Sequence, residues 1–212
     1  MIGMIYNISC SIKDSFEEKD KARESSLAIS RDVVRNCRTA MYSIHNRDFD
    51  RAKKLISEAM EMTEKMNTLL ADHPDIYYSG FLEHAQQEFV ECLVIYNILN
   101  GEDKEMPGPQ ELNVSSVAYL NGLGDVGGEL RRHILDLIRK DRPEEGEKYL
   151  GLMEEIYNCL MMFDYPDAMT KGLRHKTDVT RSIIEKTRGD LTNAMRQQKL
   201  EKAMKEFENR IN

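Results

Sequence analysis

The chain has 212 residues, of which 41% are hydrophobic and 32% are charged, and its net charge is −7. A chain of this length and hydrophobic content can bury a core within one large domain. The negative net charge excludes a nucleic-acid-binding protein that is basic over its whole surface, but it does not exclude a local basic surface.

The cysteine pattern and the lack of long apolar stretches indicate a cytoplasmic protein. The four cysteines lie far apart, at positions 10, 37, 92 and 159, and no histidine is at metal spacing from any of them. This pattern indicates reduced thiols and argues against a zinc site. The apolar start, MIGMIYNISCSI, lacks the basic residues and the cleavage site of a signal peptide. No stretch approaches the ~20 apolar residues of a membrane span, so no membrane partner is expected.

Apolar residues recur along the chain at helical spacing. We expect residues 1–16 to form an N-terminal arm without a fixed fold and residues 17–212 to form a single all-α domain, a bundle of six to seven helices. Asp48 is a candidate N-cap and Gly101 a candidate C-cap, and residues 102–112 are the expected loop. The expected helices cover residues 17–46, 49–70, the stretch 84–99, and residues 114–140, 144–162 and 167–208.

Three glycines imitate a dinucleotide-binding motif. Gly122, Gly124 and Gly127 match the pattern G-x-G-x-x-G. However, the segment that follows is helical in pattern, and Asp125 would place a negative charge where a pyrophosphate should sit. We therefore favour the alternative that these small residues let another helix approach closely.

Acidic residues interrupt an apolar helix. The stretch HAQQEFVECLVIYNIL sets Glu88 and Glu91 among apolar residues. Because a buried carboxylate without a partner is costly, something must compensate these charges. Glu88 and Glu91 are three residues apart and share a helix face, and the same holds at spacing four for Asp125 and Glu129. If the two helices pack antiparallel, the four carboxylates converge and favour Mg²⁺, with Mn²⁺ as the alternative ion.

Two other interpretations of these acids stay open. In the first, Glu88 and Glu91 lie at the edge of the apolar face beside basic side chains, and Glu129 pairs with Arg132 or His133. In the second, the chain is an all-α nucleotide pyrophosphatase. Those enzymes combine E-x-x-E with a downstream E-x-x-D, and only the first element is evident in this sequence.

The charges are unevenly distributed and favour a polyanionic substrate. Between Glu58 and Glu91 there are eight acidic residues and one lysine, whereas between Lys171 and Lys205 there are ten basic residues and four acidic ones. Arg31, Arg35 and Arg38 recur at helical spacing. They form either a second basic strip for phosphates or a solvated helix face.

Four stretches resemble the translin family, and within it the translin-associated factor X branch. They lie between about residues 20 and 191, in the family's order and spacing: ARESSLAISRDVVRNCRTAMYSIHN, YYSGFLEHAQQEFVECLVIYNIL, YLNGLGDVGGELRRHILDLI and FDYPDAMTKGLRHKTDVTRSIIEKTRGDL. The resemblance implies an all-α chain that assembles into a hollow oligomer and binds single-stranded RNA, with single-stranded DNA as an alternative. In the factor-X branch it also implies a Mg²⁺-dependent endoribonuclease.

The same resemblance assigns candidate catalytic and metal-binding residues. It gives Glu88 and Glu91 of QEFVE and Asp125 of GLGDVGGELRR catalytic roles, with Glu129 beside them. We expect these four to hold Mg²⁺, which would activate a water for attack on a phosphodiester. The compact form, without the eukaryotic N-terminal extension, favours an archaeal-type member. We expect it to assemble with itself, or with a translin-like paralogue.

Basic residues near Asp125 and on the last helix are the candidate RNA contacts: Arg131, Arg132, Arg174, Lys176 and Arg181. Phosphate contacts carry no sequence information, so we expect the protein to recognise a single strand rather than a motif. The alternative function is a non-catalytic, oligomeric module that binds single-stranded RNA or DNA, in which the carboxylates are structural.

Overall fold

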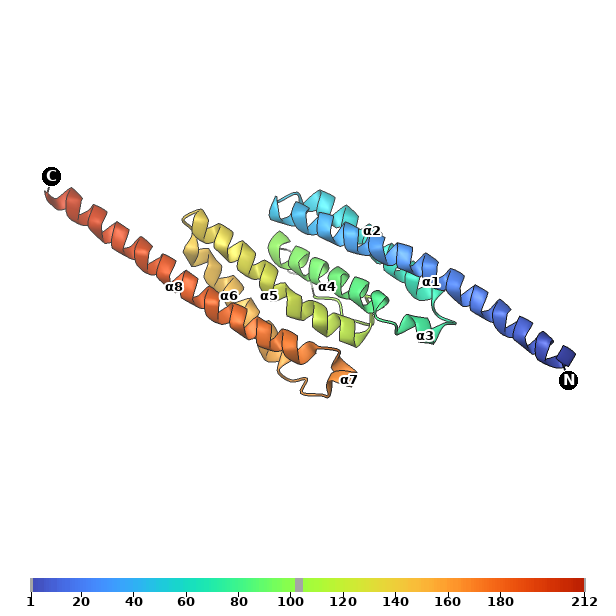
Figure 1. The fold of residues 1–212 in the computed structure, drawn as a ribbon. Helices are drawn as coiled ribbons and strands as arrows, with labels where there is room; N and C mark the ends of the chain where they lie inside the picture. Colours follow the sequence, from blue (N-terminus) through green and yellow to red (C-terminus); the bar gives the residue numbers. More distant parts are fainter. Residues whose placement is uncertain (1, 102–104, 212) are drawn as a thin grey trace. The chain divides into compact units, whose positions relative to one another are not determined.

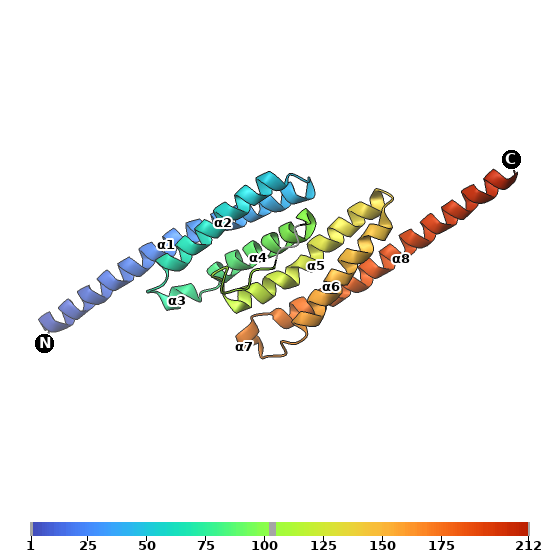
Figure 2. The same ribbon diagram turned by 180° about the vertical axis from the view of Figure 1, so that it is seen from behind.

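The structure is a computed structural model that describes residues 2–101 and 105–211. All regular secondary structure in this part of the chain is helical, so the predicted all-α class is confirmed (Figures 1 and 2). The chain divides into two compact units, Met1–Tyr119 and Leu120–Asn212. The single domain expected over residues 17–212 stays a prediction. No helix in the described ranges is long and apolar enough to cross a membrane.

Unit 1 is built on three long helices. They are α1 (Ile2–His45), α2 (Phe49–Leu69) and α4 (Phe81–Asn100), with the one-turn helix α3 (Pro74–Tyr77) between α2 and α4. The three long helices pack against one another (Figures 1 and 2). As predicted, the Asp48 side chain caps α2 by accepting a hydrogen bond from the Arg51 N–H at 3.2 Å, and Gly101 ends α4 with a left-handed φ of 72°. The core includes Val33, Ile44, Met66, Phe89 and Ile95.

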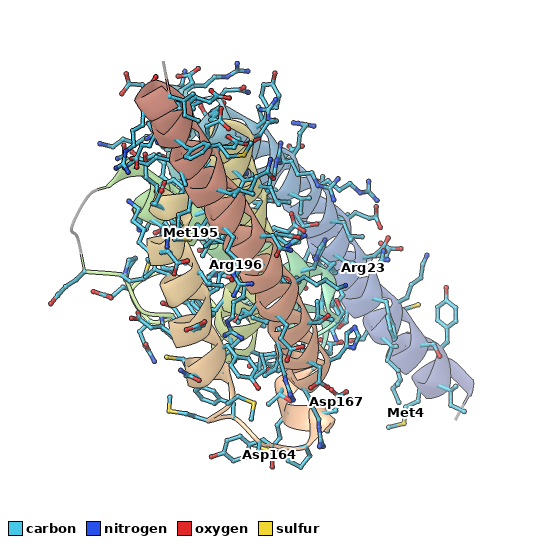
Figure 3. The ribbon with its side chains drawn as sticks, turned by 90° about the vertical axis from the view of Figure 1, so that its left-hand side faces the viewer. Met4, Arg23, Asp164, Asp167, Met195 and Arg196 are labelled. Carbon is cyan, nitrogen blue, oxygen red and sulfur yellow. The ribbon has the colours of Figure 1, made fainter. Side chains whose placement is uncertain are left out.

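The segment expected as an arm without a fixed fold is helical. Residues 2–16 form the start of α1, because no proline interrupts the helix before it ends at His45. The side chains of residues 3–16 are largely exposed, as Figure 3 shows for Met4. Apolar side chains that are at least half exposed in this segment are Met4, Ile5, Tyr6, Ile8, Ile12 and Phe16.

A chain of buried amides fixes the turn that precedes α5 (Ser116–Arg139). Gln86 of α4 is fully buried, and its side chain donates to Oδ1 of Asn67 at 3.1 Å and accepts from the N–H of Ser115 at 3.1 Å. Asn67 in turn donates to the carbonyl oxygen of Asn113 at 2.6 Å. Buried polar groups are stable only when they are paired in this way, so the amides hold the turn firmly on α2 and α4.

Unit 2 contains most of α5 and the remaining helices. These are the 3₁₀ helix η1 (Pro143–Glu145), α6 (Gly146–Leu160), α7 (Asp167–Thr170) and α8 (Leu173–Ile211). The last helix was predicted as one element from residue 167. It is divided because Lys171 and Gly172 both have positive φ, 46° and 87°, which ends one helix and starts another. The core includes Val126, Leu130, Ile134, Met153, Leu160, Leu173 and Leu191.

The glycines of the imitated motif lie inside α5, where no dinucleotide-binding loop exists. A Cβ atom on Gly124 would lie 3.2 Å from Cβ of Lys176, and one on Gly127 would lie 3.5 Å from Cγ2 of Thr180. The hydroxyl of Thr180 donates to the carbonyl oxygen of Gly124 at 3.1 Å. The preferred interpretation is therefore correct for Gly124 and Gly127, which let α8 approach α5 closely.

Candidate active site

Glu88 and Glu91 lie on a partly exposed edge of α4. The Glu88 side chain is 22% exposed, and its Oε1 lies 3.9 Å from Nε2 of His84, one helical turn earlier. Glu91 is also partly buried, whereas the neighbours Phe89, Val90 and Cys92 are buried. Both carboxylates therefore lie at the margin of the unit 1 core, where solvent or a ligand can compensate their charge.

Besides a hydrogen bond with Cys37 and burial, the negative charges of Glu88 and Glu91 help to raise the pKa of Cys92. Its thiol donates to the carbonyl oxygen of Cys37 on α1 at 3.5 Å. The pKa of Cys92 is raised well above its ordinary value, first by a hydrogen bond with Cys37, then by burial and by electrostatic interactions with Cys37, Glu91 and Glu88. Cys92 is thus held as a protonated thiol, without the thiolate character of a nucleophile.

Asp125 and Glu129 lie on one face of α5 in unit 2. Oδ2 of Asp125 is 2.5 Å from Nζ of Lys176 on α8, and the same ammonium donates to the carbonyl oxygen of Asn121 at 3.3 Å. Oε2 of Glu129 is 3.6 Å from Nη1 of Arg132, which is one of the two partners that the structural alternative expected. Each carboxylate of this pair is accompanied by a cationic side chain.

The basic residues predicted to contact RNA fall into two groups. Arg131 is tied to α8, because it pairs with Asp190 at 2.8 Å and donates to the hydroxyl of Thr187 at 3.0 Å. Lys176 is engaged with Asp125. The other three are exposed and can turn toward a ligand: Arg132, Arg174 and Arg181, the last of which pairs with Glu185 on its own helix at 3.2 Å.

Comparison with known proteins identifies the family. The protein MJ0175 of Methanocaldococcus jannaschii is 39% identical over 189 residues, which cover 88% of this chain and 82% of the relative. The structure of AfC3PO in complex with duplex RNA matches with a TM-score of 0.80 and 32% identity, over 87% of this chain and 95% of that one. The chain belongs to the translin-associated factor X (C3PO) family. Models of known protein families give no match.

A further C3PO structure extends the comparison of folds. Apo-NeC3PO matches with a TM-score of 0.78 and 23% identity, over 87% of this chain and 95% of that one. The resemblance read from the sequence is therefore confirmed for the family and for the fold. The roles of the four carboxylates in this C3PO-family chain stay predictions.

The donor chemistry fits the predicted ion. Each unit presents two partly exposed carboxylates, and Mg²⁺ commonly binds through one or two carboxylates while it keeps several waters. Over residues 2–101 and 105–211, the structure shows no group of three or more His, Cys, Asp or Glu side chains that could hold a metal ion. Asp125 is paired with the ammonium group of Lys176.

Sequence reasoning missed the groove beside α4. The three arginines of the suspected basic strip, Arg31, Arg35 and Arg38, line it together with His84 and Phe81. Helical spacing placed the arginines on one face, but nothing in the sequence showed that this face meets the start of α4.

Proposed function

We propose that this C3PO-family chain is a Mg²⁺-dependent endoribonuclease that binds its metal through Glu88, Glu91, Asp125 and Glu129. The observation that carries the proposal is that all four are partly exposed acids set in pairs on single helix faces. Its family context supports an RNA substrate, since the related AfC3PO has been solved with duplex RNA.

The proposed chemistry is hydrolysis of a phosphodiester bond. When bound, Mg²⁺ supplies Lewis acidity, makes water a better nucleophile and offsets negative charge on the phosphate. Lys176 beside Asp125 and Arg132 beside Glu129 are placed to donate charge-assisted hydrogen bonds to phosphate oxygens. The protonated Cys92 thiol takes no nucleophilic part, because a thiol attacks only as the thiolate.

We retain a single strand as the proposed substrate. The exposed arginines on α5 and α8 can bind phosphates of either a single strand or a duplex, because phosphate contacts do not depend on base pairing. The AfC3PO complex contains duplex RNA, so both forms belong in the assay.

We also propose that the chain works as a hollow homo-oligomer. The end of α8 carries a row of exposed apolar side chains at spacings of four, three and four: Leu200, Met204, Phe207 and Ile211. This spacing is that of a coiled-coil seam, and contiguous exposed apolar surfaces mark interaction sites. The exposed apolar start of α1 offers a second such face.

The test is an RNA cleavage assay with a binding control. Labelled single-stranded and duplex RNA are incubated with the protein in Mg²⁺ or in EDTA. The wild type is compared with Glu91→Gln and with Glu61→Gln, an exposed position of α2 outside the proposed site. We expect Mg²⁺-dependent cleavage that falls by about 10²-fold or more in Glu91→Gln, with RNA affinity in EDTA unchanged.

The other outcomes separate the alternative functions. RNA binding without cleavage in either Mg²⁺ or Mn²⁺ would support a non-catalytic RNA-binding module. Hydrolysis of nucleoside triphosphates without RNA cleavage would support a pyrophosphatase. Equal cleavage by the wild type and Glu91→Gln would show that Glu91 is not part of the active site.

A further inference from the structure

A groove of about 530 Å³ lies between α1 and the start of α4 in unit 1. Its volume is within the range of small-ligand sites, about 300–1,000 Å³. The lining consists of Leu27, Ser30, Arg31, Val34, Arg35, Arg38 and Thr39 of α1 together with Phe81 and His84 of α4. The groove thus combines three arginines with an apolar surface, and none of its lining residues is acidic.

Two of the three arginines are available to a ligand. Arg35 pairs with Asp32 at 2.9 Å on its own helix. Within the part of the chain that the structure describes, neither Arg31 nor Arg38 is in an ion pair. Both are exposed. Since guanidinium groups bind phosphates through paired hydrogen bonds, the groove is suited to a phosphorylated ligand.

The apolar part of the groove suits the other half of a nucleotide. Phe81, Leu27 and Val34 line it. An aromatic ring can stack with a nucleobase whatever the sequence, because every base has a π-face. A ligand with phosphates and a flat, weakly polar ring therefore complements both parts of the lining.

His84 links the groove to the candidate active site. It lines the groove, and its Nε2 lies 3.9 Å from Oε1 of Glu88. A nucleotide held in the groove would therefore lie within one helical turn of a predicted catalytic carboxylate.

We infer that the groove binds one nucleotide of the RNA substrate, with its phosphates on Arg31 and Arg38 and its base against Phe81. This inference rests on the proposed RNA substrate, but not on cleavage. It adds a binding surface on α1 to the contacts proposed on α5 and α8, and it orients the strand so that a neighbouring phosphodiester faces Glu88.

The first experiment measures RNA affinity in EDTA, where no cleavage takes place. The double variant Arg31→Gln/Arg38→Gln is compared with Lys21→Gln/Arg23→Gln, which removes the same charge from exposed positions of the same helix outside the groove. We expect the groove variant to bind single-stranded RNA about tenfold more weakly, with a salt slope lower by ~1.4 for two lost phosphate contacts. The control should change affinity by less than about twofold.

Equal affinities of the two double variants would overturn the inference. The result is separable from the nuclease proposal, because a wild type that binds RNA without cleaving it leaves the affinity comparison intact. A wild type that binds no RNA would overturn both. Binding of an acidic peptide in place of RNA, lost in the groove variant alone, would also overturn the inference and assign the groove to a protein partner.

A second variant tests the base contact. The sequence contains no tryptophan, so Phe81→Trp introduces a single tryptophan in the groove, which can be excited selectively at about 295 nm. We expect its emission to be quenched by a short RNA and not by an abasic ribose-phosphate oligomer of the same length, in EDTA. No quenching by RNA, or equal quenching by both oligomers, would contradict a base at Phe81.

Discussion

Lys176 of α8 places its Nζ atom 2.5 Å from Oδ2 of Asp125 on α5. The two side chains are only 22% and 33% exposed, so solvent screens their attraction incompletely. Lys176, which is predicted to contact RNA, is thus ion-paired with Asp125, which is predicted to bind metal. If Asp125 is a ligand, Lys176 competes with the ion for the same carboxylate.

This competition predicts how Lys176→Gln changes two affinities. Removal of the ammonium should tighten Mn²⁺ or Mg²⁺ binding by about fivefold, which corresponds to the ~1 kcal/mol of a partly exposed ion pair. RNA binding in EDTA should weaken at the same time. Isothermal titration of both ligands measures the two effects, with Lys186→Gln, an exposed position of the same helix, as the control. Metal affinity that stays constant or falls would show that Lys176 and the ion do not share Asp125.

The approach of α8 to α5 predicts that two alanine substitutions differ in their effect on stability. Alanine favours a helix over glycine by up to about 1 kcal/mol, so Gly128→Ala, with no atom within 4 Å of the added Cβ, should stabilise the protein. Gly124→Ala should be less stable than Gly128→Ala by about 1–3 kcal/mol, because its Cβ would lie 3.2 Å from Lys176. Denaturant unfolding of both variants measures this difference. Equal stabilisation would mean that the close contact is not maintained in solution.

The helical part of the fold could be predicted from the sequence for a clear reason. Helices are indicated by apolar residues at helical spacing, and helix ends by caps such as Asp48 and Gly101. Both signals depend only on residues that are close in the sequence. The break before α8 could not be predicted in this way, because Lys171 adopts a positive φ, which is uncommon for lysine. The role of Gln86 was likewise hidden, since its partners come from α2 and from the turn before α5.

The buried thiol of Cys92 predicts a pH dependence of stability. Its pKa in the folded chain is raised above the ordinary value of 9.0, first by its hydrogen bond with Cys37 and then by burial and nearby negative charge. Above pH 9 the unfolded chain therefore loses this proton while the folded chain keeps it. The contribution of this protonated thiol to stability should be fully present below pH 9, and the free energy of unfolding should fall as the pH rises above 9.

Guanidinium chloride unfolding of the wild type and Cys92→Ala between pH 7.5 and 10 measures this dependence. Other groups titrate in both proteins, so the wild type should lose more stability than the variant over this range. Identical pH profiles would contradict the raised pKa. An independent check is thiol labelling at pH 8, in which exposed Cys159 should react long before Cys92.

The apolar row at the end of α8 predicts the effect of charge on assembly. Phe207→Glu places a carboxylate within the row and should reduce the molar mass measured by light scattering, because the contact with another copy would bury that charge. Asn209→Glu adds the same charge at an exposed polar position and should leave the mass unchanged. Equal masses of the two variants would place the subunit contact elsewhere.

The candidate site was only partly accessible to sequence reasoning. Glu88 and Glu91 both lie in α4 and are both partly exposed, and Arg132, one of the two alternative partners of Glu129, lies beside it. The engagement of Lys176 with Asp125 and of Arg131 with Asp190 depends on how α8 packs on α5. The partners in these two pairs are separated by 51 and 59 positions in the sequence, so no local sequence pattern predicts that they meet.

The proposed function depends most directly on metal binding by the acid pair Glu88 and Glu91 on α4 and by the acid pair Asp125 and Glu129 on α5. Substitution of Fe²⁺ for Mg²⁺, followed by ascorbate and peroxide, cuts a polypeptide where it lies close to the iron, and mass spectrometry locates the cuts. We predict cuts near residues 88–91 and near residues 125–129 that excess Mg²⁺ suppresses. The cuts near residues 88–91 should weaken in Glu91→Gln, and those near residues 125–129 in Asp125→Asn. Cuts that avoid both segments, or that neither excess Mg²⁺ nor the two substitutions change, would contradict metal binding by these acids.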